Sequence, residues 1–136
     1  MQFSELGGTL QVVAYVPSQA TLGTVDNWPV WQTGLKAKIT AVTFVPSAAI
    51  TANGTHYSDY TLTRYTAGAS GTTVATRSWA ATNSVAETPE LMTLSATAAN
   101  LLLAVDDTLS VVKTVTGNGL VIPDGVLVVR YQLTGS

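Results

Sequence analysis

The sequence predicts an all-β protein, a jelly-roll-like β-sandwich of about seven to eight antiparallel strands with an extended N-terminal arm. Three observations lead to this fold. Several short segments alternate apolar and polar residues with a period of two, as half-buried strands do. Glycine, proline and asparagine turn signals separate them roughly every 8–14 residues, a spacing typical of sandwiches and jelly rolls. The 136 residues suffice for a core, and we find no repeat of fixed period and no heptads.

The pattern divides the chain into an N-terminal arm, residues 1–34, and a sandwich domain, residues 35–136. Within the arm we expect one strand, at residues 10–16, where apolar residues dominate between two turn signals. The stretch that follows has no clear period. Pro29 lies in it, and proline lacks the N–H that a sheet ladder uses. We therefore expect this stretch to be extended and irregular.

Two tryptophans flank the proline of the arm. Trp28 and Trp31 either cover the core of their own domain or anchor the arm in a neighbouring subunit, since aromatic residues are favoured interface anchors. Both interpretations stay open. Trp28, Pro29 and Trp31 are the candidate interface residues.

The first strand of the sandwich domain is expected at residues 35–45. Its first half alternates apolar residues with Lys36, Lys38 and a threonine, so that the lysines lie on a solvated face. Its second half is apolar at both parities, which indicates either burial on two sides or a bulge. Pro46 ends the strand.

The remaining strands follow at short intervals. A hairpin with a longer loop is expected first, and one or two helical turns are expected at residues 96–103. The chain then closes with two strands around a loop that contains glycines and a proline. The further strands are expected at residues 59–66, 72–79, 90–95, 105–115 and 126–133.

The composition favours a structural or assembling protein. Charged residues make up 10% of the chain, against about 25% in ordinary domains, so threonine, serine and asparagine cover much of the surface. Such a surface is less costly to bury against a neighbour than lysine or glutamate. The net charge of −2 and the scattered basic residues argue against nucleic-acid binding.

The cellular context follows from absences in the sequence. The chain has no cysteine, which removes disulfides and thiolate chemistry and fits synthesis in a reducing cytoplasm. We expect no signal peptide, because the start lacks a basic leader and an apolar run. We expect no membrane partner, because no apolar stretch approaches the ~20 residues of a membrane helix.

No pattern of residues indicates catalysis, and we expect no enzyme and no cofactor. The single histidine, His56, follows a turn signal and is expected on an exposed loop tip. Glu87 and Glu90 flank a proline and are expected to be solvated loop charges rather than a glycosidase pair.

A calcium ion is the one metal that the sequence leaves open. Asp106 and Asp107, with Asn118 and Asp124, could supply oxygen ligands, although they lack the spacing of an EF-hand. The alternative is that these residues turn the chain at strand ends. We expect no metal site here, but the sequence leaves calcium binding open.

Two segments carry a resemblance to a known family. In residues 39–50 a strand ends in Val-Pro and a small-residue loop, and an aromatic strand returns at 57–62. In residues 107–131 a strand opened by an acidic residue leads through Gly-x-Gly and Pro-x-Gly to a closing strand. In order and spacing these segments resemble small head-decoration or capsid-associated proteins of tailed bacteriophages. The resemblance covers roughly residues 35–133.

The resemblance implies a non-enzymatic protein of the virion. Such a protein sits on the outer surface of the capsid as a symmetric oligomer, most often a trimer, and reinforces it. Its partners would be copies of itself and the major capsid protein. The arm, with Trp28 and Trp31, would make the contacts between subunits or to the capsid.

The alternative function is a carbohydrate- or receptor-binding module of a phage particle, since jelly rolls host many lectins. Such a module needs exposed aromatic rings on one face. Tyr57, Tyr60, Tyr65 and Trp79 are the candidates, unless they pack across strands inside the sheet.

Overall fold

The structure is a computed structural model, and it describes residues 8–19, 23, 25–67 and 69–134. Strands account for most of the regular structure, with one 3-10 turn, η2 (Ala98–Leu101), among the described residues. The strands are β1 (Leu10–Val16), β2 (Asp26–Gln32), β3 (Ala37–Pro46), β4 (Tyr57–Tyr65), β5 (Thr72–Ser78), β6 (Glu90–Leu91), β7 (Thr93–Leu94), β8 (Leu102–Leu103), β9 (Thr108–Thr116) and β10 (Gly125–Leu133).

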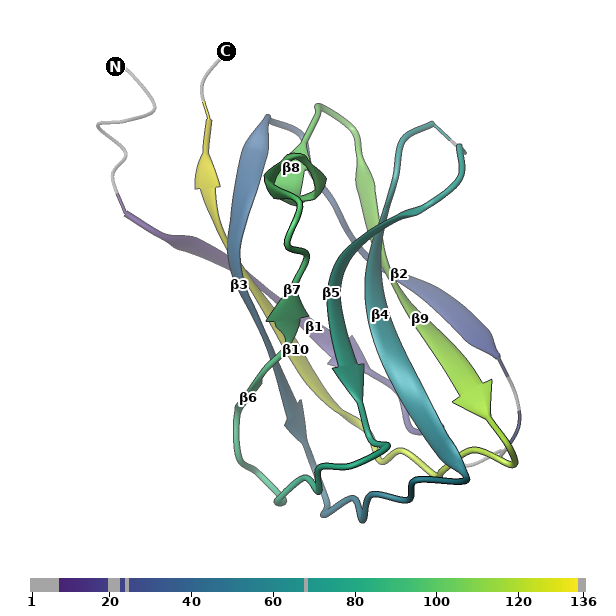
Figure 1. Ribbon diagram of the computed structural model, residues 1–136. Helices are drawn as coiled ribbons and strands as arrows, with labels where there is room; N and C mark the ends of the chain where they lie inside the picture. The colour runs from purple at the N-terminus through teal and green to yellow at the C-terminus, as the bar shows by residue number, and fades with distance from the viewer. Residues whose placement is uncertain (1–7, 20–22, 24, 68, 135–136) are drawn as a thin grey trace.

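Two antiparallel sheets pack face to face. One has the order β1-β10-β3-β6, with β8 also paired to β3, and the other has the order β2-β9-β4-β5-β7. In Figure 1, β3 and β10 lie on the left, and β5, β4 and β9 lie side by side on the right. Seven long strands and the interrupted edge β6–β8 give the eight strands of a jelly roll. The predicted β-sandwich is confirmed.

The core lies between the two sheets and is built around three aromatic rings. Phe44, Tyr60 and Trp79 pack edge to face, with centroids 5.1–5.9 Å apart. All three are at most 1% exposed. Edge-to-face contact is the favoured geometry of aromatic pairs, because it brings the positive edge of one ring to the negative face of another.

Strand β3 confirms the alternation from Ala37 onward and the predicted bulge, but it begins at Ala37, and Leu35 is 46% exposed. Ala37 and Ile39 are fully buried, whereas Lys36 and Lys38 are exposed. Tyr131 of β10 pairs with Ile39, but Arg130 pairs with the residue two positions further on, so Thr40 is the extra residue of a bulge. The bulge moves the buried positions from odd to even residue numbers, so that Val42 and Phe44 face the core while Val45 faces outward.

The predicted arm is wrong for the described part of residues 1–34. That part contains two strands rather than one, and each lies within the sandwich: β1 pairs with β10, and β2 pairs with β9. Residues 1–7 of the arm lie outside the described residues. Pro29 does not exclude a strand here, because β2 is an edge strand, where proline is tolerated.

Two other segments also differ from expectation. Residues 90–95 form two short strands, because β6 pairs with β3 in one sheet and β7 pairs with β5 in the other. Met92 lies at the crossing, and its side chain is 4% exposed. The expected helical turns at 96–103 are reduced to η2 and β8. The predicted hairpin with a longer loop is confirmed as β4 and β5.

Candidate functional site

An apolar patch on the outer face of the β1-β10-β3-β6 sheet is the candidate interaction surface. We call it the valine face. Its residues point outward because the residues next to them in sequence, such as Phe44 and Leu127, are buried in the core. The valine face consists of Val13, Tyr15, Thr43, Val45, Val126 and Val128.

Strand register arranges the valine face in two rows across three strands. Tyr15, Val126 and Val45 are paired neighbours in one row. The second row joins Val13 to Val128 and Val128 to Thr43, and on the next strand it ends at Leu91 of β6. Side chains in such rows lie within about 5 Å of one another, so they form one continuous surface.

The valine face is unusually apolar for a surface that meets water. Val13, Tyr15 and the neighbouring Leu91 are 59%, 66% and 74% exposed. The matching row of the opposite sheet is dominated by threonine, with Thr61, Thr76 and Thr93 on adjacent strands. Since an antiparallel sheet that faces solvent is normally polar on that side, the valine face is a candidate docking surface.

Opposite charges flank the valine face along β10. Arg130 is exposed beyond Val128. Asp124 lies beyond Val126, where its carboxylate accepts hydrogen bonds from the Ser47 hydroxyl at 2.6 Å and the Tyr15 hydroxyl at 3.3 Å. The patch is therefore basic at one end and acidic at the other.

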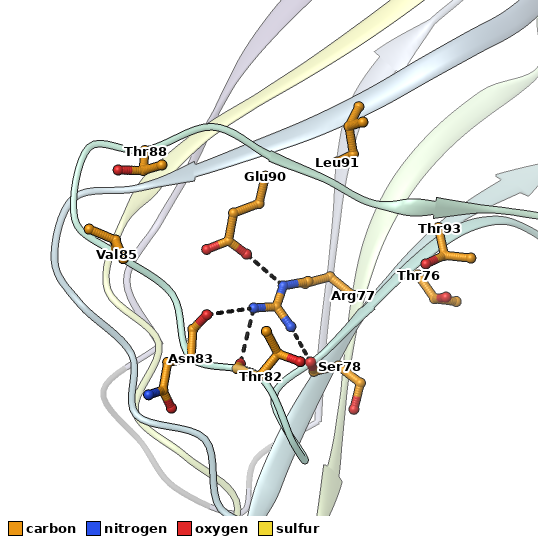
Figure 2. Close-up of a pocket in the computed structure, with 10 residues that line it drawn as sticks. All are labelled: Thr76, Arg77, Ser78, Thr82, Asn83, Val85, Thr88, Glu90, Leu91 and Thr93. Atoms are coloured by element: carbon orange, nitrogen blue, oxygen red, sulfur yellow. Dashed lines mark hydrogen bonds and ion pairs between the residues drawn. The ribbon is translucent and has the colours of Figure 1, made fainter.

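A groove of about 620 Å³ lies beside this sheet, between β5 and the 79–89 loop (Figure 2). Arg77 occupies its centre. The Arg77 Nε donates to the Glu90 carboxylate at 2.7 Å, and Nη2 donates to the Thr82 carbonyl and the Ser84 hydroxyl, each at 3.1 Å. Nη1 donates to the Ser78 carbonyl.

In this groove Arg77 holds the loop to the sheet and does not form a free anion-binding site. Every nitrogen of the Arg77 guanidinium already donates within the chain, and its carbon lies 5.0 Å from the centre of the Trp79 ring. Glu90 is thus an ion-pair partner and not the solvated charge that was expected. Glu87 has no comparable partner among the described residues and has a positive φ of 56°.

A second hollow, of about 410 Å³, contains Arg64 and Asp107. Asp107 is 2% exposed. One of its oxygens accepts from the Thr66 hydroxyl at 2.7 Å, and the other accepts from the Ala104 amide at 2.8 Å. Both carboxylate oxygens therefore shape the turn before β9, as the alternative to a calcium site requires.

The four residues considered for calcium do not form one site. Asp106 and Asp107 precede β9, whereas Asn118 and Asp124 follow it, and nine strand residues at about 3.3 Å each separate the two pairs. Within the described ranges no three histidine, aspartate or glutamate side chains cluster as metal ligands.

The candidate interface residues lie on β2. Trp28 packs edge to face on Tyr60 at 5.7 Å, and Trp31 packs on Tyr131 at 4.8 Å. Both tryptophans are partly buried against the core, and Pro29 is exposed. A bulge at Val30 turns both tryptophans inward although they are three residues apart. Their role at an interface stays a prediction.

His56 contacts another loop instead of lying free at a loop tip. Its side chain is partly buried, and its Nδ1 accepts the Asn118 amide at 3.0 Å. Gly117 leaves room for this contact, since a Cβ there would collide with the imidazole, and its φ of 61° also favours glycine. His56 therefore connects its own turn to the turn that contains Asn118, at one end of the sandwich.

The aromatic platform expected of a carbohydrate-binding module is absent from the described surface. Tyr60 and Trp79 are 1% and 0% exposed and belong to the core. Tyr57 and Tyr65 are partly buried at opposite ends of β4. The alternative that these rings pack inside the sandwich is correct for Tyr60 and Trp79.

A buried polar group lies between the sheets near β2. Lys113 is 0% exposed and pairs in register with Asp26 on one side and Tyr60 on the other. Burial lowers the pKa of Lys113, and the Asp26 carboxylate partly opposes this shift. Burial also raises the pKa of Tyr60 far above its usual value, with a further contribution from Asp26.

Comparisons with known proteins show no family for this chain. No protein-family model and no curated protein matches the chain. One solved structure is similar, described as the structure of infectious bursal disease virus Gx strain, with 13% identity and a TM-score of 0.42. The match covers 95% of this chain but 33% of that chain. A similarity at this score shows neither family nor function.

In the part of the chain that the structure describes, no helix is long and apolar enough to cross a bilayer.

Proposed function

We propose that this protein is a structural component of a virus particle, and more narrowly a decoration protein on the outer surface of a bacteriophage capsid. The valine face carries this proposal, because it is an ordered apolar surface on a rigid sheet. Its strands are apolar at both parities, so one parity fills the core and the other is left for a partner.

The jelly-roll topology agrees with this proposal. Jelly rolls are common in viral capsid proteins and also in lectins, so the fold by itself is an analogy. The resemblance of residues 35–133 to phage decoration proteins favours the capsid role. The described residues offer a lectin no exposed aromatic platform, since Tyr60 and Trp79 are buried.

Reinforcement needs no chemistry beyond burial of apolar surface. Each square ångström of apolar surface removed from water contributes about 25 cal/mol. A protein that binds assembled capsid but not separated subunits shifts the equilibrium toward the assembled particle. The partners are the major capsid protein and copies of this chain, in a symmetric oligomer. The resemblance implies a trimer, and the mass in solution tests that number.

Labelling of virus particles tests the proposal. Antibodies against the purified protein should decorate intact particles banded from a culture of the source, as seen by immunogold electron microscopy. Particles that carry no label when intact or after disruption would contradict the proposal. Specific hits on a glycan array would favour the carbohydrate-binding alternative instead.

A matched pair of variants tests the role of the valine face. Added purified protein should bind particles stripped of it, and Val128→Asp should reduce this binding at least tenfold. Thr61→Asp places the same charge on the outer face of the opposite sheet and should bind like the wild type. Equal binding by the two variants would remove the valine face from the proposal.

A further inference from the structure

We infer that the valine face binds a second copy of this chain, in a two-fold pair of sheets packed face to face. The inference rests on the proposed function in using the same surface, and it names a second copy as the occupant of that surface. Val128→Asp then loses particle binding because copies on the particle no longer pair, and the pair replaces the trimer that the resemblance implies. Its basis is the distribution of apolar and charged residues along β10.

The two charges that flank the valine face are complementary to the same two charges of a second copy related by a two-fold axis. Asp124 and Arg130 each lie three residues from Leu127, on opposite sides. Consider a two-fold axis that lies between the two sheets, at the level of Leu127 and across the strands. It places Arg130 of each copy over Asp124 of the other. No internal partner of Arg130 occurs among the described residues, so its guanidinium is available for this pair.

The same axis brings the apolar rows together. Val126 of one copy faces Val128 of the other, Tyr15 faces Val13, and Val45 faces Thr43. Tyr15 thus meets the smaller Val13, the other facing side chains are of similar size, and the two rows exchange places. Residue i contacts residue j while j contacts i, which is the defining property of a two-fold interface. Two sheets stacked in this way lie about 10 Å apart.

The small size of the valine face limits the strength of the pair. Three strands about 4.8 Å apart and seven residues of about 3.3 Å each give a patch of roughly 300 Å². A stable complex usually buries about 800 Å² per partner. We therefore expect weak, concentration-dependent association in free solution. On a particle, where copies are held close together, the effective concentration is far higher.

The test is the mass of the purified wild-type protein by sedimentation equilibrium, over about 5 μM to 1 mM. The mean mass should rise from the 14.1 kDa of one chain toward twice that value. Arg130→Asp should weaken association at least tenfold, because it places two acidic groups together. Adding Asp124→Arg to that variant should restore association, since it rebuilds the charge pair in reverse order.

Two controls separate docking from misfolding. Lys38→Asp makes the same change of charge on the same sheet, outside the valine face, and should associate like the wild type. Circular dichroism should be unchanged in every variant, including Asp124→Arg, which loses the bonds from Ser47 and Tyr15. Val128→Asp provides a second disruption that leaves both charges in place.

Three outcomes would overturn the inference. They are a single-chain mass at all concentrations, a three-chain mass, and equal association by Arg130→Asp and Lys38→Asp. These outcomes are independent of particle labelling. A monomer that still labels particles contradicts the two-fold pair alone, and a dimer absent from particles contradicts the proposed function alone.

Discussion

Tyr60 fills the core with its aromatic ring but also buries a hydroxyl group there. The ring contacts Phe44, Trp28 and Trp79, but the hydroxyl is buried and has no hydrogen-bond partner among the described residues. An unpaired buried hydroxyl costs free energy, roughly 1–3 kcal/mol in protein mutational data. The packing of the ring outweighs that cost.

Tyr60→Phe should therefore raise the free energy of unfolding, by about 1 kcal/mol at pH 7.5. The substitution keeps the ring and removes the unpaired hydroxyl. Urea denaturation measures the change. Tyr57→Phe, at a partly buried tyrosine on the same strand, is the matched control and should change the stability by less than about 0.5 kcal/mol.

The same variant should alter the stability at alkaline pH. The pKa of Tyr60 is raised in the folded state, whereas an unfolded tyrosine ionises near pH 10. The neutral Tyr60 hydroxyl therefore makes its full contribution to the free energy of unfolding below about pH 10, and this contribution falls as the pH rises further. Between pH 9 and pH 11 the wild type should lose more stability than Tyr60→Phe. Equal losses of stability in the two proteins would show that the Tyr60 hydroxyl ionises as readily in the folded state as in the unfolded state.

The loop between β5 and β6 is held by the Arg77 side chain in addition to backbone hydrogen bonds between Ser84 and Ile50 and from Glu87 to Pro46. Arg77 donates to carbonyls at both ends of the turn after β5, and it is paired with Glu90 at the start of β6 (Figure 2). It also donates to the Ser84 hydroxyl. Ser84 also accepts the Trp79 indole N–H at 2.7 Å. The loop is therefore fixed to the core by a connected set of hydrogen bonds.

Arg77→Lys should lower the free energy of unfolding by about 1–3 kcal/mol. An ammonium keeps the charge but cannot reach partners on several sides as the planar guanidinium does. Amide hydrogen exchange should also become faster across residues 79–89. Arg130→Lys, at an exposed position, is the control and should leave both readouts unchanged. Similar values for the two variants would show that the loop is held by other contacts.

The sequence predicted most strands but misjudged β2, and the reason is local. A period of two reveals a strand only while the register is regular, and the bulge at Val30 places Trp28 and Trp31 on the same face at odd spacing. The crossing at Met92 was hidden because two-residue strands have no measurable period. The valine face was partly predictable, since residues 41–45 are apolar at both parities.

The whole molecule has two unlike outer faces on one core. Threonine covers the outside of the sheet that contains β4, and valine covers the outside of the sheet that contains β10. Among the described strands, two edges are formed by two-residue strands, and the β2 edge is interrupted by Pro29 and a bulge, whereas β1 is an edge strand of seven residues. The valine face contains no charged residue, which contributes to the low charge of the chain.

The N-terminal segment, residues 1–34, contributes strands to both sheets, so its deletion should affect the whole fold. Residues 1–34 include an edge strand of each sheet, and Val16, Trp28 and Trp31 contact the core from them. Deleting residues 1–34 should therefore unfold the sandwich, with loss of near-ultraviolet circular dichroism and of amide signal dispersion. Deleting residues 1–7, which removes no described strand, is the control and should keep both signals. A folded sandwich without residues 1–34 would show that β1 and β2 are dispensable, and it would restore the division of the chain at residue 34.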